Sequence, residues 1–596
     1  MSFTAPSSFS TRPTLQGTFG MSASTHWLAT ATAQSVLERG GNAFDAATAA
    51  AFVLHVVEPH LNGPGGDLTA IFSNAQDPAP KVLMGQGPAP AAATREHYLA
   101  EGLDLVPGSG ALAAAVPGAV DAWLLLLHDH GSWRLPDVLD YAIGYARHGH
   151  PVAAGVCRTI ETVRELFAEH WTSSAAQWLP DGKPPRTGEL VFNHPWASTL
   201  QKLSQAAPDG SRNEQITAAR ELWKQQIAAA VETFAKTPHR HSDGRDHAGV
   251  ISAQDFRDFS AYYETPVTLE FRGHTIVKAG PWSQGPALLQ SLRILDGFDD
   301  EYLDPSTALG AHHILEAQKL AYADREAYYG DREDIPLEVL LSADYAAGRR
   351  ALIGERASHS FRPGVVPGRE AFTPPLRTEY STSNINSAGL GEPTVRASGE
   401  TRGDTCHLDV IDRWGNIISA TPSGGWLQSS PYIPEVGFCL GTRLQMSWLE
   451  PGGPASLEPG HRPRSTLTPT LLLKDGRAVS ALGSPGGDQQ DQWQLLFLLR
   501  TLVGGYSPQQ AIDAPALHTT SLAGSFWPRT WEPGGAVVEN RLGEEVITEL
   551  EHRGHRVTRA GDWALGRLCV VGVDPASEVF YAAANPRGMQ GYASGR

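Results

Sequence analysis

The sequence is poor in cysteine, in positive charge and in long apolar runs. Its 596 residues include four cysteines, which are widely spaced and form no Cys-x-x-Cys pair. This spacing argues against a disulfide framework and against a cysteine-ligated zinc site, so we expect reduced thiols. The formal charge of −17 argues against a protein that binds phosphate backbones through a basic face, and against one that binds anionic membranes.

Targeting and membrane signals are lacking as well. Residues 1–6 carry no basic stretch and lead into no long apolar stretch, so the sequence predicts no secretory signal. No run of about 18 apolar residues occurs, which is the length that a membrane-spanning helix needs. We therefore expect a cytoplasmic protein that binds neither nucleic acid nor a membrane, and no metal or organic cofactor is indicated.

The chain does contain enough apolar residues for a large buried core, since 41% are hydrophobic and 19% are charged. Helical patterns cover residues 25–39 and 308–329, and Asn42 can cap another helix that runs to about Val57. After residue 405 the pattern changes to hairpins with short polar turns. Long helices combined with antiparallel hairpins predict a layered α+β architecture.

A histidine-rich stretch at residues 238–247 raises the question of a metal site. His239 and His241 are two positions apart, and His247 follows in a segment with proline and glycine. The stretch lacks the helical His-x3-His spacing and the cysteine partner that would indicate a zinc site. We therefore favour a solvated loop over a metal site.

The stretch around Thr405 carries the main chemical hypothesis. Residues 356–404 are rich in Pro, Ser, Thr, Gly and Arg, which predicts a mobile linker, and a strand pattern begins abruptly at Thr405. An internal threonine hydroxyl is a poor nucleophile, whereas a threonine at a chain terminus has its own α-amine as a base. Attack of the hydroxyl on the carbonyl of Asp404, followed by hydrolysis of the ester, would create that terminus.

Acyl transfer also requires hydrogen-bond donors for the negative charge that develops on the carbonyl oxygen. Two later segments can provide them. Residues 462–467 contain two adjacent hydroxyl residues, and residues 483–487 form a Gly-Ser-Pro-Gly-Gly turn before a predicted helix. This turn is not followed by the Lys-Ser/Thr of a phosphate-binding loop, so we discount nucleotide binding.

Motifs spread over nearly the whole chain resemble those of the gamma-glutamyltranspeptidase (glutathione hydrolase) family. They lie at residues 40–47, 57–60, 116–118, 321–325, 404–407, 462–466 and 483–487. The resemblance implies an N-terminal-nucleophile hydrolase with a four-layer αββα sandwich. It also implies self-cleavage between Asp404 and Thr405 into a large subunit, 1–404, and a small subunit, 405–596. The two would form a heterodimer that could assemble further.

The resemblance assigns roles to individual residues. Thr405 matches the nucleophile, and Ser423 falls where the family places a second threonine that assists it. The pair Ser465–Thr466 matches a serine pair that contacts the substrate, and Gly486–Gly487 matches the glycines of the oxyanion hole. Cys406 is not expected to act as the nucleophile, because neighbouring strand residues point to opposite faces.

Three positions in the implied substrate pocket depart from the family. Gln86 replaces the arginine that clamps the glutamyl α-carboxylate, and Gly425 replaces an asparagine. The acidic residue that holds the substrate α-amine should lie near residues 441–448, where no carboxylate occurs and Arg443 brings the opposite charge. Loss of one charged hydrogen bond costs about 2–5 kcal/mol, so glutathione should be a poor substrate.

Three hypotheses remain open. The first is a self-processed amidohydrolase or acyltransferase that acts, through an acyl-enzyme, on a small amide or peptide-like molecule that is not a γ-glutamyl compound. It includes cephalosporin-acylase-like hydrolysis and the C–C bond hydrolysis of relatives in antibiotic pathways. The second is a glutathione hydrolase with different recognition residues. The third is a non-catalytic scaffold, against which the retention of Thr405, Ser465, Thr466 and the glycine turn argues.

Overall fold

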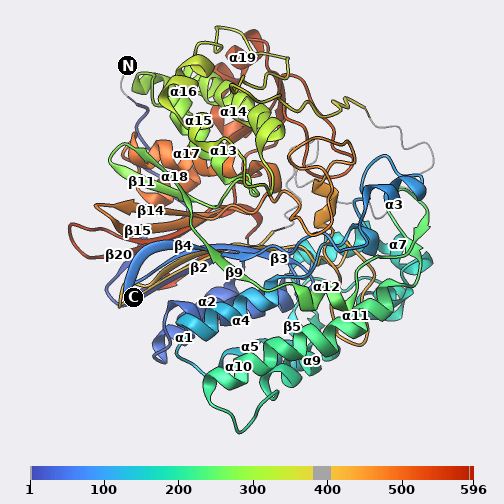
Figure 1. The fold of residues 1–596 in the computed structure, drawn as a ribbon. Coiled ribbons are helices and arrows are strands. Elements are labelled where there is room, and N and C mark those ends of the chain that lie inside the picture. Colours follow the sequence, from blue (N-terminus) through green and yellow to red (C-terminus); the bar gives the residue numbers. More distant parts are fainter. Residues whose placement is uncertain (1–2, 380–404, 590) are drawn as a thin grey trace.

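Two seven-stranded sheets face each other at the centre of the molecule, and helices cover both outer faces (Figure 1). This computed structural model describes residues 3–379, 405–589 and 591–596. Within these ranges the layers follow the order helix, sheet, sheet, helix. The predicted αββα sandwich is confirmed.

The sheet that contains the strand after Thr405 combines both ends of the chain. Its order is β21 (Tyr592–Gly595), β2 (Gly20–Ser24), β12 (Leu408–Asp412), β13 (Ile417–Ser423), β3 (Asp67–Asn74), β4 (Asp77–Gly85) and β9 (Tyr262–Glu264). β12 pairs antiparallel with β2 on one side and with β13 on the other, and β13 pairs with β3. Two strands from beyond residue 405 therefore lie between strands of the N-terminal part.

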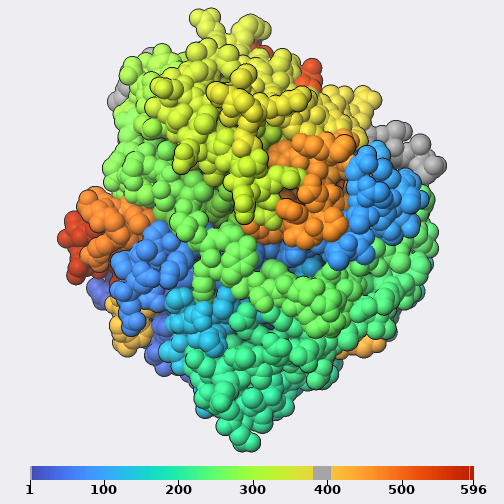
Figure 2. Space-filling model, in the orientation of Figure 1, coloured from blue at the N-terminus to red at the C-terminus, as the bar shows by residue number. Residues whose placement is uncertain are grey.

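The second sheet is shared in the same way. Its order is β1 (Leu15–Gly17), β20 (Phe580–Ala584), β19 (Cys569–Val573), β15 (Arg477–Gly483), β14 (Thr470–Lys474), β11 (His274–Lys278) and β10 (Val267–Phe271). β20 pairs with β1, and β14 pairs with β11. Figure 2 shows the same intermixing on the surface, where orange C-terminal segments lie between blue and yellow-green segments.

Apolar helices pack on each outer face. α1 (Trp27–Glu38), α2 (Ala43–Val57) and α4 (Ala119–His130) cover the sheet with β12, while α13 (Gly285–Leu295) and α17 (Gln490–Leu502) cover the other, with α14 (Ala308–Tyr328) packed on α13. Every residue of α2 is buried, in keeping with its uniformly apolar, alanine-rich sequence. Asn42 and Asp45 form a reciprocal capping box at its start.

Several predicted elements are confirmed. The patterns at 25–39 and 308–329 are α1 and α14, and the helix capped by Asn42 is α2. The hairpins expected after residue 405 are β12–β13, β14–β15 and β19–β20. Within the described ranges, no helix is long and apolar enough to cross a membrane. The cytoplasmic location stays a prediction.

The histidine-rich stretch differs from the expected solvated loop. His239 and His247 pair in a short two-stranded ribbon, His241 follows its first strand, and all three side chains are buried. His239 and His241 accept hydrogen bonds from the backbone N–H groups of Ala111 and Leu112, each at 3.0 Å. The prediction was wrong because these imidazoles satisfy donors of a loop more than a hundred positions away, which local composition does not reveal.

The expected linker is described only in its first part. Arg362 forms an ion pair with Glu316 of α14 at 2.9 Å, and Arg377 forms a parallel bridge with Thr530. Residues 380–404, and with them Asp404, lie outside the described residues. The division into segments 1–404 and 405–596 therefore stays a prediction.

Candidate active site

Thr405 lies just before β12, beside the C-terminal end of β13. Its backbone forms an antiparallel bridge with Ser423, and the two side-chain oxygens are 3.2 Å apart. Both side chains are buried. The hairpin register brings them together, because Thr405 begins one arm and Ser423 ends the other. A hydroxyl at this distance can exchange a proton with the Thr405 hydroxyl.

Cys406 uses the other face of the strand. Its thiol donates a hydrogen bond to the Glu58 carboxylate at 3.1 Å, at a fully buried position. Burial, together with the negative charge of Glu58, raises the pKa of the thiol well above its ordinary value. A protonated, buried thiol is a poor nucleophile. Burial also raises the pKa of Glu58 to about 7.

His407 connects the two sheets, a role that sequence reasoning did not assign. A Cβ atom at Gly483 would lie 2.2 Å from the His407 ring, so only glycine fits there. Thr421 lies 3.0 Å from Nδ1 of the ring, and Asp409 lies 2.9 Å from Nε2. His407 therefore sets the distance from Thr405's strand to β15, which leads into the glycine turn.

The glycine turn has a backbone geometry that other residues rarely adopt. Gly486 has a φ of +125° and Gly487 a φ of +53°. A Cβ atom at Gly486 would also approach Trp493 within 2.4 Å. The Gly487 carbonyl accepts a hydrogen bond from the side chain of Gln284 at 3.0 Å, which holds the turn in place before α17. A turn held in this way before a helix is suited to stabilise an oxyanion through its backbone N–H groups, of which that of Gly487 lies 3.3 Å from the side-chain oxygen of Gln490.

Ser465 and Thr466 are joined to this turn through shared partners. The Ser465 carbonyl accepts from the backbone N–H of Gln284, whose side chain holds Gly487. The amide of Gln490, in the orientation that satisfies its neighbours, donates to the Thr466 carbonyl at 3.2 Å. The Thr466 hydroxyl is buried and has no hydrogen-bond partner among the described residues. The fold thus unites the two segments that the sequence predicts to face the acyl group.

Gln86 and Gly425 occupy crowded positions. Gln86 is fully buried; its amide nitrogen donates to the Gly87 carbonyl at 3.3 Å, and its amide oxygen has no partner in the described part of the chain. Gly425 has a φ of +67°. A Cβ atom added at Gly63 would lie 2.3 Å from the Gly425 carbonyl oxygen. Gly425 therefore contributes backbone packing where the family has an amide side chain.

Arg443 does not present a free positive charge, which corrects the expectation from sequence. Its guanidinium forms a bidentate pair with Asp67 at the start of β3, with N–O distances of 2.5 and 2.8 Å. Both side chains are 5% exposed. Burial raises the pKa of Asp67, while the charge of Arg443 counteracts this rise. A carboxylate is thus present after all, brought from 376 positions earlier, but Arg443 occupies it.

The ion pair lines a small cavity. The cavity has a volume of about 10 Å³, roughly enough for one water molecule. Its other walls are mainly glycine backbone and the apolar side chains of Trp426, Met446 and Phe526. Since Asp67 and Arg443 neutralise each other, the lining carries no net charge.

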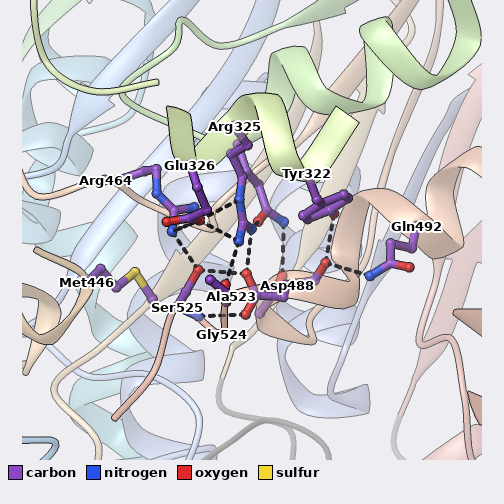
Figure 3. A network of polar contacts seen from close by, with 12 residues as sticks. Tyr322, Arg325, Glu326, Met446, Arg464, Asp488, Gln492, Ala523, Gly524 and Ser525 are labelled. Carbon is purple, nitrogen blue, oxygen red and sulfur yellow. Dashed lines mark hydrogen bonds and ion pairs between the residues drawn. The ribbon is translucent and has the colours of Figure 1, made fainter. Parts of the chain in front are cut away.

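A buried cluster of charged residues, which sequence reasoning missed, adjoins this region (Figure 3). Arg325 of α14 pairs with Asp488 at 2.5 Å and with Glu326 at 2.9 Å. Arg464 pairs with Glu326 at 2.8 Å, and Arg529 lies 3.6 Å from the same carboxylate. The sequence offered one signal, because Arg464 and Asp488 directly flank the hydroxyl pair and the glycine turn.

Comparisons with known proteins agree with this arrangement. A family model described as Gamma-glutamyltranspeptidase matches residues 29–595. The glutathione hydrolase-like YwrD proenzyme of Bacillus subtilis (strain 168) is 30% identical over 580 residues, or 96% of this chain and 98% of the relative. A solved structure of LmbA2991HD is 54% identical with a TM-score of 0.93, and covers 99% of this chain and 100% of that one. The cephalosporin acylase from Bacillus halodurans is 26% identical with a TM-score of 0.82, and covers 99% and 98%.

Proposed function

Because the chain belongs to the gamma-glutamyltranspeptidase family and is an N-terminal-nucleophile hydrolase, we propose that it cleaves itself at Thr405 and then hydrolyses a small amide whose acyl group is not γ-glutamyl. The hydroxyl pair of Thr405 and Ser423, together with the glycine turn, supports the reaction type. The changed pocket supports the changed substrate, as does the similarity to a cephalosporin acylase.

Self-cleavage begins when the Thr405 hydroxyl oxygen attacks the carbonyl carbon of Asp404. The bond from that carbon to the Thr405 nitrogen breaks, and the nitrogen receives the hydroxyl proton, so the peptide becomes an ester and a free α-amine. Water then hydrolyses the ester to the Asp404 carboxylate and a free Thr405 hydroxyl. Ser423, at 3.2 Å from that hydroxyl, is close enough to pass the proton.

We further propose that the two products, 1–404 and 405–596, stay together as a heterodimer. β12 and β13 lie between β2 and β3, and β14 and β20 pair with β11 and β1. Separation would expose unpaired strand edges in both sheets and the apolar core between them. Cleavage of one peptide bond therefore changes the chemistry at Thr405 without releasing either part.

In each turnover, the Thr405 hydroxyl attacks the amide carbonyl of the donor while the α-amine accepts its proton. Backbone N–H groups at Gly486–Gly487 stabilise the oxyanion. The amine leaves with the proton, and an acyl ester on Thr405 remains. Water attacks this ester, the carboxylic acid is released, and the Thr405 hydroxyl is restored.

The Asp67–Arg443 pair carries the choice of substrate. A γ-glutamyl group presents an ammonium and a carboxylate, and each needs an opposite charge in the pocket. Asp67 and Arg443 are fixed to each other, and Gln86 is neutral. To bind γ-glutamyl, the protein would have to open this buried ion pair, so the two charges of the ligand would replace an existing contact rather than add new ones.

The competing function is glutathione hydrolysis with other recognition residues, which the name of the relative YwrD suggests. Three anilides with five-carbon acyl groups separate the two functions: γ-glutamyl, glutaryl, which lacks the α-amine, and pentanoyl, which lacks both charges. We expect purified, processed protein to cleave glutaryl or pentanoyl anilide with a kcat/KM at least about 30-fold above that for γ-glutamyl anilide. Preference for γ-glutamyl anilide would contradict the proposal.

A further inference from the structure

The buried cluster, of which Figure 3 labels Arg325, Glu326, Arg464 and Asp488, holds more positive than negative charge. Its guanidinium groups belong to Arg325, Arg464 and Arg529, and its carboxylates to Glu326 and Asp488. All five side chains are buried. Three positive charges against two negative charges leave one positive charge in excess among these five residues.

Both carboxylates are already used. Glu326 accepts from Arg325, from Arg464 and, at 3.1 Å, from the Trp448 indole. Asp488 accepts from Arg325 and, at 2.6 Å, from the Ser525 hydroxyl. Arg529 is the least engaged of the three arginines, since its ion pair with Glu326 is 3.6 Å long and includes no hydrogen bond.

The excess charge is accompanied by unused donors. Among the described residues, Nε and Nη1 of Arg464 and both terminal nitrogens of Arg529 have no hydrogen-bond partner. Burial lowers the pKa of Arg464 to about 10 and that of Arg529 to about 9. The Arg529 guanidinium stacks 3.3 Å from the centre of the Trp448 ring, which holds its plane. Buried, oriented N–H groups of this kind bind an anion strongly.

The cluster adjoins the two segments that face the reacting carbonyl. Arg464 is the residue directly before Ser465, and Asp488 is the residue directly after Gly487. The Ser525 side chain connects these two charged residues, since it lies 3.1 Å from Arg464 and 2.6 Å from Asp488.

The cluster also reaches the wall of the cavity. Ser525 is followed by Phe526, which lines the cavity together with Met446. Figure 3 shows Met446 beside Ser525, on the side of Arg464. The cluster is therefore next to the apolar wall of the cavity, while neither Arg464 nor Arg529 lines the cavity itself.

We propose that Arg464 and Arg529 form an anion subsite of the acyl pocket, and that the acyl donor carries a carboxylate that binds there. This inference rests on the proposed hydrolase function and narrows its substrate to half-amides of dicarboxylic acids. A carboxylate supplies two acceptor oxygens and equalises the charges of the cluster. Inorganic phosphate shares this chemistry, so the experiment includes it as a separate arm.

Arg500 provides a matched control for a buried arginine. It is buried, donates to the Pro515 carbonyl at 2.6 Å, and has an Nε without a partner among the described residues. It lies ten residues along α17 from Gln490, about 15 Å from the start of that helix. Arg500→Gln therefore reproduces the loss of a buried guanidinium away from the proposed subsite.

The kinetic arm compares glutaryl anilide with pentanoyl anilide, using processed wild type and the variants Arg464→Gln, Arg529→Gln and Arg500→Gln. We expect wild type to prefer the glutaryl donor. Arg464→Gln and Arg529→Gln should each raise the KM for glutaryl anilide at least about 30-fold and leave that for pentanoyl anilide within about 3-fold. Arg500→Gln should leave the preference unchanged. Equal effects of the subsite variants on both donors would overturn the inference.

The binding arm needs no variant and therefore stands even if the variants fail to fold. Glutarate, its neutral diamide and inorganic phosphate are titrated calorimetrically into processed wild-type protein, and the thermal midpoint is recorded with each. We expect glutarate to bind and to raise the midpoint, and the diamide to do neither. Absence of glutarate binding would overturn the inference. If phosphate displaces glutarate but does not compete with glutaryl anilide in the kinetic assay, the inference is also overturned, because the site would then hold a free anion rather than the donor.

The outcomes for this inference and for the proposed function are distinguishable. If pentanoyl anilide is cleaved as well as glutaryl anilide, and both better than γ-glutamyl anilide, the anion subsite is wrong and the hydrolase proposal stands. If γ-glutamyl anilide is preferred to both, the proposed function itself is wrong.

Discussion

The nucleophile end of β12 and the wall of the acyl pocket satisfy their polar groups in different ways. Thr405 pairs with Ser423, and both ring nitrogens of His407 have partners. In the pocket wall, by contrast, buried polar atoms lack partners among the described residues on Gln86, Arg464, Thr466 and Arg529.

This contrast separates two tasks. Groups that perform a reaction gain from being fixed before the substrate arrives, so their hydrogen bonds are internal. Groups that recognise a substrate must keep donors and acceptors for it, at a cost in stability while the site is empty. We therefore assign the unpartnered atoms of Gln86, Arg464, Thr466 and Arg529 to recognition, and the hydrogen-bonded pair of Thr405 and Ser423 to the chemistry.

The largest expected effect lies at the nucleophile end. Thr405→Ala removes the attacking oxygen, so it should abolish self-cleavage and lower amidase activity at least about 10⁴-fold. Denaturing electrophoresis and anilide hydrolysis measure the two losses. Cys406→Ser, one position away on the other face, is the control and should remain processed and active. Residual activity of Thr405→Ala near the wild-type level would contradict the assignment of the nucleophile.

The next largest effect concerns the neutral ion pair of the pocket. Arg443→Met leaves Asp67 buried without its partner, which should lower the free energy of unfolding by about 3–5 kcal/mol. The double variant Asp67→Asn/Arg443→Met should recover most of this loss, because no charge then remains unpaired. Urea unfolding of the processed protein measures both. If the single variant is as stable as wild type, the pair is not the buried, closed contact that excludes γ-glutamyl.

A change in the glycine turn tests the reaction side without removing the nucleophile. Gly486→Ala introduces a Cβ at a φ of +125° and 2.4 Å from Trp493, which displaces the oxyanion donors. We expect kcat to fall about 10²–10³-fold. Gly476→Ala is the matched control, because Gly476 also has a positive φ but no atom within 4 Å of the added Cβ. A similar fall in both variants would point to general backbone strain rather than to the oxyanion hole.

The smallest expected effect is a dependence of the protein's stability on pH, which Glu58 causes beside Cys406. The pKa of Glu58 is raised from 4.5 to about 7 by burial, so the folded state retains a proton that the unfolded state releases. Stability should therefore fall as the pH rises from about 4.5 to 7, by about 3 kcal/mol in total. Glu58→Gln should remove this slope, while Glu545→Gln, at an exposed position, should leave it. An unchanged slope in Glu58→Gln would assign the pH dependence to another group.

The sequence was sufficient for the parts of the fold that local chemistry determines. The capping box at Asn42 and the apolar run that follows identify α2, and the hairpins after residue 405 follow from alternating apolar residues and short turns. The pairing of Thr405 with Ser423 is a consequence of one such hairpin. These features depend on residues that are close along the chain.

The recognition wall depends on residues that are distant along the chain, and it was not predictable. Asp67 and Arg443 are 376 positions apart, so sequence reasoning found the arginine but not its partner. The charged cluster combines residues from four places in the chain. They are Arg325 and Glu326 of α14, Arg464 before the hydroxyl pair, Asp488 after the glycine turn, and Arg529. Similarly, the burial of His239 and His241 depends on backbone donors at 111 and 112.

The most direct test of the central claim is the intact mass of the purified protein, with N-terminal sequencing of its smaller chain. We expect two chains that co-purify, 1–404 and 405–596, with Thr405 as the first residue of the smaller one. After brief incubation with glutaryl anilide and acid quenching, the smaller chain should gain the mass of one glutaryl group. An active protein that stays at its full length, or an acyl group found on the larger chain, would contradict the claim that Thr405 becomes an N-terminal nucleophile.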